Sequence, residues 1–383
     1  MIAEKFAEMS DSEIMIVRIH LFSSYFSTAK VTCPAMFALR YASAKGGVEN
    51  NLALEQKVDK PVLPGAGPAA LVKVLHSSLN PQDYKLPELP FLGPSTIPPP
   101  AIPGTDYVGR IHETNIPELE QGDLVFGTLD LPTKYGSLAE YVLIKGTDGI
   151  AKLPKGFEES RIDLQLFACL GTAGLTALQS LESQTSGAQV FINGGSGGTG
   201  TFCIQIAKNI NGAARIVTTC SAKNFALVKE LGADEVIDYA QVNVVESLRA
   251  VTQLAGRKFD LVVDNVGNSP DLYWQSHSFL HEGGHFIQIG APNLNLGYAF
   301  ATARKLMWSR LPWTARAKFS AMVVKTNNEQ LETLGRWIAE GKLKAVIGGR
   351  YSLGEAAQAF AVLKSGKARG KLVIDVAGYL SLE

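Results

Sequence analysis

The residues with the clearest chemical role in this sequence are a run of seven small residues from Gly194 to Gly200. An apolar segment precedes the run and an amphipathic segment follows it, which predicts a strand, a tight turn and a helix in succession. Gly194, Gly197 and Gly200 are spaced three apart, as suits a backbone that turns sharply and lies against a phosphate. Because the start of a helix has unpaired N–H groups and the positive end of its dipole, the pattern predicts a pyrophosphate site. A flexible loop is the alternative for a glycine run taken alone.

The residues from Cys220 to Asn224 indicate which nucleotide such a site would bind. About 20 residues after the glycine turn, a site for NAD has an Asp or Glu for the ribose 2′-hydroxyl. No carboxylate occurs here; Lys223 could attract a 2′-phosphate, and Ser221 and Asn224 could hydrogen-bond it. The pattern therefore favours NADPH, with a solvated surface lysine at Lys223 as the alternative.

Strands and helices are expected to alternate around the glycine turn. After Leu153, short apolar runs predict strands and amphipathic runs predict helices. The expected strands are 190–193, 215–220, 235–238, 260–265 and 285–290, and the expected helices are 170–179, 225–231 and the segment after Gly200. Such alternation gives a parallel sheet with helices on both faces, so the fold class is α/β.

The rest of the chain is expected to be β-rich and irregular. Strands are predicted at 70–76, 107–112 and 136–144, and a turn followed by a strand at 121–127. A polar loop is expected at 77–85 and an irregular, proline-rich segment at 86–104. Near the end, helices at about 329–340 and 355–365 precede a strand at 371–376. We expect this last strand to pair with the first section of the chain.

The composition argues against several classes of protein. With 383 residues two domains are expected, and 46% hydrophobic and 19% charged residues are usual for a globular chain. Lys+Arg and Asp+Glu both number 36, so no net field favours nucleic acid, and no apolar run reaches the roughly 18 residues of a membrane-spanning helix. The four cysteines lie far apart without a CxxC pair, which argues against disulfides or structural zinc and favours a reducing, cytoplasmic location.

The first 35 residues allow two interpretations. No acidic residue occurs between Glu13 and Glu49, a composition typical of a mitochondrial transit peptide if translation starts near Met15. Read from Met1, the segment contains several acidic residues, which argues against a transit peptide. The preferred interpretation is a poorly ordered extension or a misassigned start, with the folded part opening at Met36.

Six motifs occur in an order that resembles the medium-chain dehydrogenase/reductase superfamily. Besides the glycine run they are Asn80–Lys85, Ile102–Gly109, Gly122–Gly127, Gly136–Tyr141 and Arg369–Ile374. The sequence is most similar to the zinc-free branch with the zeta-crystallin-like quinone oxidoreductases and the enone and enoyl reductases, over about residues 36 to 377. The resemblance implies a Rossmann-type doubly wound parallel sheet domain inserted in a β-rich GroES-like catalytic domain. The implied boundaries are 1–35 for the extension, 36–158 plus 325–383 for the catalytic domain and 159–324 for the NADPH-binding domain.

The metal ligands of zinc-dependent relatives are missing from this sequence. Those relatives have a Cys after the first catalytic strand and a Gly-His-Glu motif, where this chain has Leu79-Asn80 and Gly104-Thr105-Asp106. A zinc site needs three or four nitrogen, sulfur or oxygen ligands in fixed geometry. We therefore expect no metal.

The resemblance implies a catalytic group and a cofactor group of residues. Asn80, Asp83, Tyr84 and Lys85 would lie at the nicotinamide end, where Tyr84 or Lys85 could donate a proton. The alternative is that Asn80 and Asp83 only fix the loop and that Asp83 pairs with Lys85. The resemblance also implies which residues bind NADPH. The pyrophosphate would be held by Gly195, Ser196, Gly197, Gly198 and Thr199, and the 2′-phosphate by Ser221, Lys223 and Asn224. Tyr239 would lie near the adenine, Asn265, Val266, Ile289 and Gly290 would lie near the nicotinamide, and Lys371 would reach the cofactor from the C-terminal strand.

The segment 297–325 is basic and apolar without an acidic residue. It includes Arg304, Lys305, Leu306, Trp308 and Phe319. It could form an apolar cleft wall or dimer surface, a peripheral membrane patch, or plain core with solvated lysines. A homodimer is usual in the families that this sequence resembles.

Without a metal, the expected chemistry is hydride delivery from NADPH to an electron-poor carbon of a small apolar quinone or α,β-unsaturated carbonyl. The acceptor could be an enone, an alkenal or an enoyl thioester. A second hypothesis is a fold relative that binds cofactor or ligand without redox turnover, such as a scaffold or a biosynthetic cyclisation catalyst. The sequence leaves the particular substrate open.

Overall fold

The computed structural model describes residues 35–154, 163–291, 295–311 and 317–382. The residues on which the transit-peptide and extension interpretations depend lie outside the described residues. Met36–Glu383 forms one compact unit, and it contains two large sheets.

The first large sheet is parallel and has the doubly wound strand order. It has six strands in the order β10-β9-β8-β11-β12-β13, and every neighbouring pair is parallel. The strands are β8 Gln189–Asn193, β9 Arg215–Cys220, β10 Glu235–Asp238, β11 Phe259–Asp264, β12 Leu280–Gln288 and β13 Lys318–Ala321. The order reverses between β8 and β11, so the chain is Rossmann-type and the α/β prediction is confirmed.

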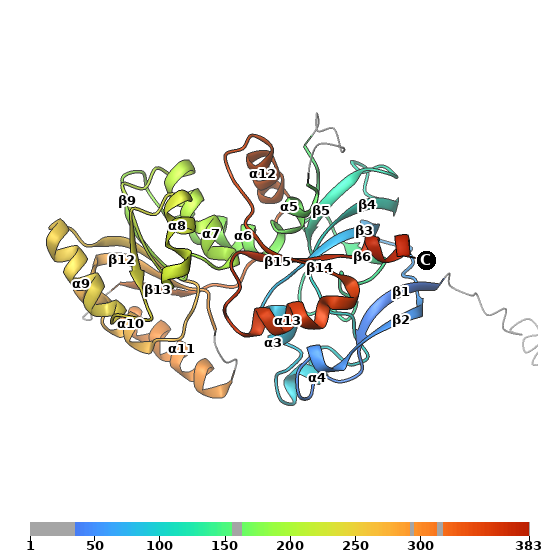
Figure 1. Ribbon diagram of the computed structural model, residues 1–383, viewed down its shortest axis with the longest axis horizontal. Helices are drawn as coiled ribbons and strands as arrows, with labels where there is room; N and C mark the ends of the chain where they lie inside the picture. The colour runs from blue at the N-terminus through green and yellow to red at the C-terminus, as the bar shows by residue number, and fades with distance from the viewer. Residues whose placement is uncertain (1–34, 155–162, 292–294, 312–316, 383) are drawn as a thin grey trace, which may run out of the picture. The chain divides into compact units, whose positions relative to one another are not determined.

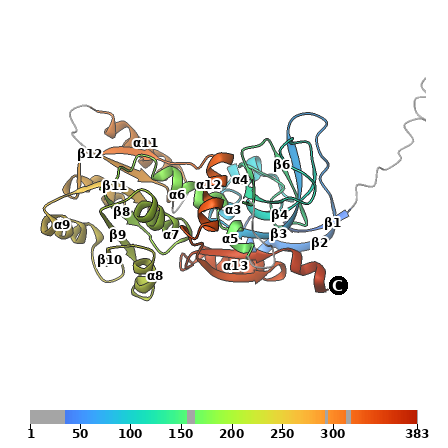
Figure 2. The same ribbon diagram turned by 90° about the horizontal axis from the view of Figure 1, so that it is seen from above.

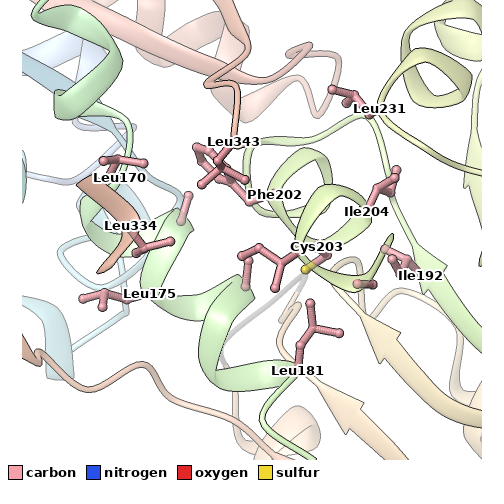
Figure 3. Packing of buried hydrophobic residues seen from close by; sticks show 14 of the residues in the cluster. Leu170, Leu175, Leu181, Ile192, Phe202, Cys203, Ile204, Leu231, Leu334 and Leu343 are labelled. Atoms are coloured by element: carbon pink, nitrogen blue, oxygen red, sulfur yellow. The ribbon is translucent and has the colours of Figure 1, made fainter. Parts of the chain in front are cut away.

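Helices cover both faces of this sheet (Figure 1). They are α6 Gly171–Ser180, α7 Gly198–Gln205, α8 Phe225–Glu230, α9 Val244–Ala255, α10 Pro270–Trp274, α11 Leu296–Ser309 and α12 Asn328–Ala339. Successive strand residues point to opposite faces: Val190 and Ile192 pack with α6, α7, α8 and α12, whereas Phe191 packs with α9, α10 and α11. Figure 3 shows Ile192 with Cys203 and Ile204 of α7. Both faces of the central strands β8, β9 and β11 are therefore buried, which explains why β8 and β11 are largely apolar.

The second large sheet is mixed and uses both ends of the described chain (Figure 2). Its strands are β3 Ala69–Leu79, β4 Asp106–Thr114, β5 Leu124–Thr128, β6 Tyr141–Lys145, β7 Ile150–Lys152, β14 Ile347–Ser352 and β15 Lys371–Asp375. β15 runs antiparallel to β3, with Leu372 opposite Leu79, so the expected return of the last strand is confirmed.

Smaller elements complete this part of the molecule. β1 Ala35–Tyr41 and β2 Leu52–Asp59 form a two-stranded sheet. The helices are α3 Gln82–Lys85, α4 Leu92–Thr96, α5 Gln165–Ala168 and α13 Ala356–Lys364.

Three sequence-based expectations need correction. The polar loop predicted at 77–85 is wrong because β3 continues to Leu79 and Gln82–Lys85 forms a helical turn. Ser77 and Ser78 are buried there because their hydroxyls donate to the carbonyl oxygens of Asp106 and Ala168, at 2.9 and 2.8 Å. The predicted strand at 136–144 begins only at Tyr141, and the segment 86–104, predicted to be irregular, contains the short helix α4. Further elements were not predicted, among them β1, β2, β13, β14, α9 and α11.

Candidate active site

The glycine run has the predicted strand–turn–helix conformation. β8 ends at Asn193, Gly194 has a positive φ of 79°, and α7 begins at Gly198. A Cβ at Gly200 would lie 2.2 Å from the carbonyl oxygen of Gly194. Glycine is therefore required at both positions, one for the turn and one for the close approach of the helix.

The segment after β9 lies against this loop. The side-chain amide of Asn224 is buried and donates to the hydroxyls of Ser196, at 3.1 Å, and Ser221, at 3.4 Å. The two segments that the resemblance assigns to the pyrophosphate and the 2′-phosphate are therefore adjacent. Lys223 and Tyr239 are exposed, so both remain available to a ligand.

The C-terminal strand also contacts the glycine loop. The Gly370 N–H donates to the Ser196 carbonyl at 2.9 Å, and Gly197 and Gly370 form a parallel bridge. A Cβ at Gly198 would lie 2.9 Å from Cδ of Lys371, so the stem of this lysine passes the start of α7. Lys371, the first residue of β15, thus connects the nucleotide loop to the mixed sheet.

The head of Lys371 lies in a polar cluster whose buried members are Lys371, Asn80, Asp83, Thr105 and Asp106, with the half-buried Thr172 at its edge. Lys371 Nζ donates to Asn80 Oδ1 at 2.6 Å, to the Leu79 carbonyl at 3.1 Å and to Asp106 Oδ2 at 3.1 Å. Asp106 Oδ1 accepts from the N–H and the hydroxyl of Thr172, both at 2.8 Å. These bonds compensate much of the cost of burying the two charges.

Asp83 fixes the turn at the entrance to α3. Its carboxylate accepts from the Asn80 N–H at 2.7 Å and from the Thr105 hydroxyl at 3.1 Å. Burial raises the pKa of Asp83 to about 7; the charge of Asp106 adds to the rise, whereas the Asn80 N–H, the charge of Lys371 and the Thr105 hydroxyl oppose it. Asp83 therefore titrates near neutrality inside the cluster.

Lys85 and Tyr84 occupy different surroundings. Lys85 Nζ donates to the Ala291 carbonyl at 2.6 Å, beyond the end of β12, and burial lowers the pKa of Lys85. Tyr84 is half-buried, with Lys364 Nζ 5.2 Å from its ring centroid. The suggestion that Asp83 pairs with Lys85 is wrong, because each has another partner. The bond from the Asn80 N–H to Asp83 holds this turn together; that Asn80 and Asp83 have no other role stays a prediction.

The ends of β8, β11 and β12 meet beside the glycine turn. Asn265 donates its amide to the Asn193 carbonyl at 3.1 Å, and the N–H groups of Ile289 and Gly290 donate to the Asp264 carbonyl at 2.9 and 3.0 Å. Within the described ranges the Asn265 Oδ1 atom is buried without a hydrogen-bond partner. Ligands of doubly wound folds bind at this edge of the sheet, where the strand order reverses.

Three polar residues at this edge were not predicted from the sequence to belong to the site. Asp264 Oδ1 accepts from Asn193 Nδ2 and from the N–H groups of Val266 and Gly267, at 2.8, 3.1 and 2.9 Å. Gln288 and Lys305 are buried beside it. An aspartate at the end of an apolar strand was a usable signal for Asp264, whereas Lys305 lay within a basic segment that suggested solvent exposure.

The basic apolar segment is divided between core and surface. Lys305 and Phe319 are buried and Leu306 packs against the core beneath α11. Leu296, Phe300 and Met307 are 89%, 74% and 70% exposed. One side of α11 therefore belongs to the core, but the expectation of solvated lysines is wrong for Lys305, which is buried. A surface interpretation stays open for the other side of α11, and residues 312–316 lie outside the described residues.

Some relatives of this family depend on zinc, so we compared the side chains of the site with the ligands that zinc needs. In the part of the chain that the structure describes, no group of three or more His, Cys, Asp and Glu side chains could hold a metal ion. Asn80 and Thr105 present an amide and a hydroxyl, and the amide oxygen binds an ammonium group. These residues do not fit a zinc site.

Among the residues that the structure describes, no helix combines the length and apolar character needed to cross a bilayer.

Comparison with known proteins agrees with this architecture. The alcohol dehydrogenase GroES-like domain family matches residues 66–155, and the family described as zinc-binding dehydrogenase matches residues 231–374. The chain is 38% identical over 357 residues to a trans-enoyl reductase, pgmF, of Aspergillus terreus, covering 89% of this chain and 96% of that protein. It is 30% identical over 354 residues to a chloroplast envelope quinone oxidoreductase homolog of Arabidopsis thaliana, covering 89% and 98%.

A solved structure shows the same fold. The quinone oxidoreductase from Coxiella burnetii superposes with a TM-score of 0.72 at 30% identity, covering 89% of this chain and 99% of that chain. Fold and site together define an oxidoreductase of the class that binds a nicotinamide dinucleotide. The chain belongs to the medium-chain dehydrogenase/reductase superfamily, in the branch of the quinone oxidoreductases and enone or enoyl reductases.

Proposed function

We propose that the protein is an NADPH-dependent, zinc-independent reductase of quinones or α,β-unsaturated carbonyl compounds. The observation that carries the proposal is the position of Lys371. Its stem passes Gly198 of the nucleotide loop, and its ammonium group lies in the buried cluster with Asn80 and Asp106. One side chain therefore joins the nucleotide loop to the segment with Asn80 and Lys85, which is where we place the acceptor oxygen.

The residues present fit NADPH. The glycine turn and the start of α7 would hold the pyrophosphate, and Ser221 with Lys223 would hold the 2′-phosphate. The Asn265 Oδ1 atom is a buried acceptor that lacks a donor among the described residues. Because an unsatisfied buried acceptor costs about 1–3 kcal/mol, a ribose hydroxyl donating to it would stabilise both ligand and protein. Asn224 is already engaged with Ser196 and Ser221, so we assign it to positioning those hydroxyls.

In the proposed mechanism Lys85 supplies the proton. Bound NADPH would supply the hydride to the electron-poor carbon. Lys85, whose pKa is lowered by burial, is a better acid near neutrality than an exposed lysine and can stabilise the negative oxygen or protonate the substrate. Tyr84 packs beside Lys364 and is assigned a structural role. Lys371 holds the Asn80 side chain through the 2.6 Å bond.

The names of the relatives support the substrate class. One is named a trans-enoyl reductase, one a quinone oxidoreductase homolog, and a third, from Solanum lycopersicum, a 2-methylene-furan-3-one reductase at 31% identity over 315 residues. Each name describes reduction of a conjugated carbonyl compound or quinone. We propose the same chemistry here on a small, apolar substrate.

The proposal includes a domain division and a homodimer. We place the catalytic domain at 36–158 plus 325–383 and the NADPH-binding domain at 159–324. β13 is an edge strand paired only with β12 among the described strands, and the exposed apolar side of α11 carries Leu296, Phe300 and Met307. A second copy that pairs at β13 would cover both features. Light scattering should give twice the chain mass; a monomeric mass, or salt-reversible binding to anionic liposomes by this face, would argue against the dimer.

The reductase proposal is tested by cofactor consumption. Oxidation of NADPH, matched mole for mole by reduced product, is expected with at least one class among quinones, alkenals, enones and enoyl thioesters. Product formed without NADPH oxidation would instead support the non-redox, cyclisation-type hypothesis. A protein that binds NADPH but turns over none of these compounds would contradict the proposal.

A further inference from the structure

A buried lysine supports the edge of the parallel sheet from α11. Lys305 is 7% exposed, and its ammonium group donates to Gln288 Oε1 at 2.7 Å. The rings of Phe319 and Tyr273 lie 5.5 and 5.8 Å from it. Burial lowers the pKa of Lys305, and the charge of Asp264 opposes the fall. Lysine is rarely buried without a strong partner, so this contact needs an explanation.

Gln288 links Lys305 to the backbone after the end of β12. It is 2% exposed, and its Nε2 donates to the Gly290 carbonyl at 3.2 Å and to the Tyr298 hydroxyl at 3.1 Å. The Tyr298 hydroxyl itself donates to the same carbonyl at 3.4 Å. Tyr298 of α11 therefore contacts Gly290 directly, and Lys305 of α11 is linked to Gly290 through Gln288.

Gly290 is packed directly on the end of β11. A Cβ at Gly290 would lie 2.2 Å from the backbone carbon of Val266, and a Cβ at Gly267 would lie 2.0 Å from the Gly290 carbonyl oxygen. The next carbonyl, that of Ala291, accepts from Lys85. Any displacement of Gly290 would therefore move the turn at Val266 and the partner of Lys85 together.

We infer that Lys305, acting through Gln288, is a positioning residue that fixes the nicotinamide end of the cofactor site and thereby the geometry of hydride transfer. The inference rests on the proposed function, and neither residue is required to touch the substrate. A misplacement of about 1 Å can cost on the order of a hundredfold in rate. The contact between Lys305 and Gln288 is therefore expected to affect the rate of hydride transfer as well as the stability of the fold.

The test uses the full chain with the variants Lys305→Met, Gln288→Leu, the double variant and Tyr298→Phe, with Lys258→Met as an exposed control. Each single change at 305 or 288 leaves a buried polar partner and is expected to lower the melting temperature. Replacing both partners by apolar groups is nearly neutral for stability, so the double variant should recover most of it. Its kcat should nevertheless stay about ten- to a hundredfold below wild type, with a small change in KM for NADPH.

Deuterated NADPH separates positioning from stability. The double variant should show a larger primary isotope effect on kcat than wild type, because hydride transfer becomes slower relative to the other steps. Tyr298→Phe, which removes one hydroxyl, should show a smaller change in the same direction. A double variant with wild-type kcat and isotope effect would overturn the inference while leaving the proposed reductase intact. A wild-type protein that never oxidises NADPH would overturn both.

Discussion

Lys371 Nζ and Asp106 Oδ2 lie 3.1 Å apart, with 3% and 0% of their side chains exposed. The pair joins the last strand of the described chain, β15, to β4 near its beginning. The same lysine passes Gly198, so one side chain connects the nucleotide loop with the polar cluster.

Removing Lys371 should therefore damage stability and activity together. Lys371→Met leaves Asp106 buried without its cation, which is expected to cost about 3–5 kcal/mol in the free energy of unfolding. Urea denaturation measures this loss. The double variant Lys371→Met/Asp106→Asn should regain much of the stability and little of the activity. Equal recovery of both would show that the pair only stabilises the fold.

Asp83 gives a prediction for the pH dependence of stability. Its pKa is raised from 3.8 to about 7, so the folded protein holds this proton more tightly than the unfolded chain. The contribution is complete below about pH 4, declines between pH 4 and 7, and is absent above. Asp83→Asn removes the charge and keeps one acceptor, its amide oxygen, for the Asn80 N–H. The stability of this variant relative to wild type should therefore increase as pH rises, by on the order of 4 kcal/mol at most. Melting temperatures from pH 5 to pH 8.5 would show this, and a difference that does not vary with pH would contradict it.

Lys85 is expected to matter more for enones than for quinones. A carbon centre needs a positioned acid, whereas the oxygens of a reduced quinone take protons readily from water. Lys85→Met should lower kcat for enones by about 10²- to 10⁴-fold and for quinones by much less. Tyr84→Phe is the matched control and should change neither appreciably. Steady-state kinetics on both substrate classes would decide, and an equal loss for both would point to a positional role for Lys85.

Lys223 should determine cofactor preference. Lys223→Ala removes the charge assigned to the 2′-phosphate, so kcat/KM for NADPH should fall by about tenfold, or ~1.4 kcal/mol, while the value for NADH stays unchanged. The ratio of the two specificity constants is the quantity to measure. If both values fell alike, the lysine would not contact the 2′-phosphate.

Much of the parallel sheet could be predicted because its signals are local. Arg215–Cys220 and Glu235–Asp238 have the bounds expected from the sequence. The first is buried along most of its length, and both contain β-branched residues that favour a strand. The glycine turn could also be predicted, because the backbone geometry requires glycine at positions 194 and 200.

The cluster and its supports could not be predicted because they join distant residues. Lys371 meets Asp106 across 265 positions, and Lys85 meets Ala291 across 206. Ser77 and Ser78 suggested a solvated loop, yet their hydroxyls are satisfied inside the protein. Lys305 suggested a charged surface because its partner, Gln288, lies on another element. In each case the sequence shows a polar residue but not the group that compensates its burial.

The most direct test of the central claim is a single-turnover experiment with enzyme, NADPH and an α,β-unsaturated acyl or ketone substrate, with NADPH absorbance and saturated product followed together. We expect NADPH absorbance and saturated product to change at one rate and in a one-to-one ratio, without added metal and in the presence of a chelator. Loss of turnover on chelation, or product formed while NADPH absorbance stays constant, would contradict it.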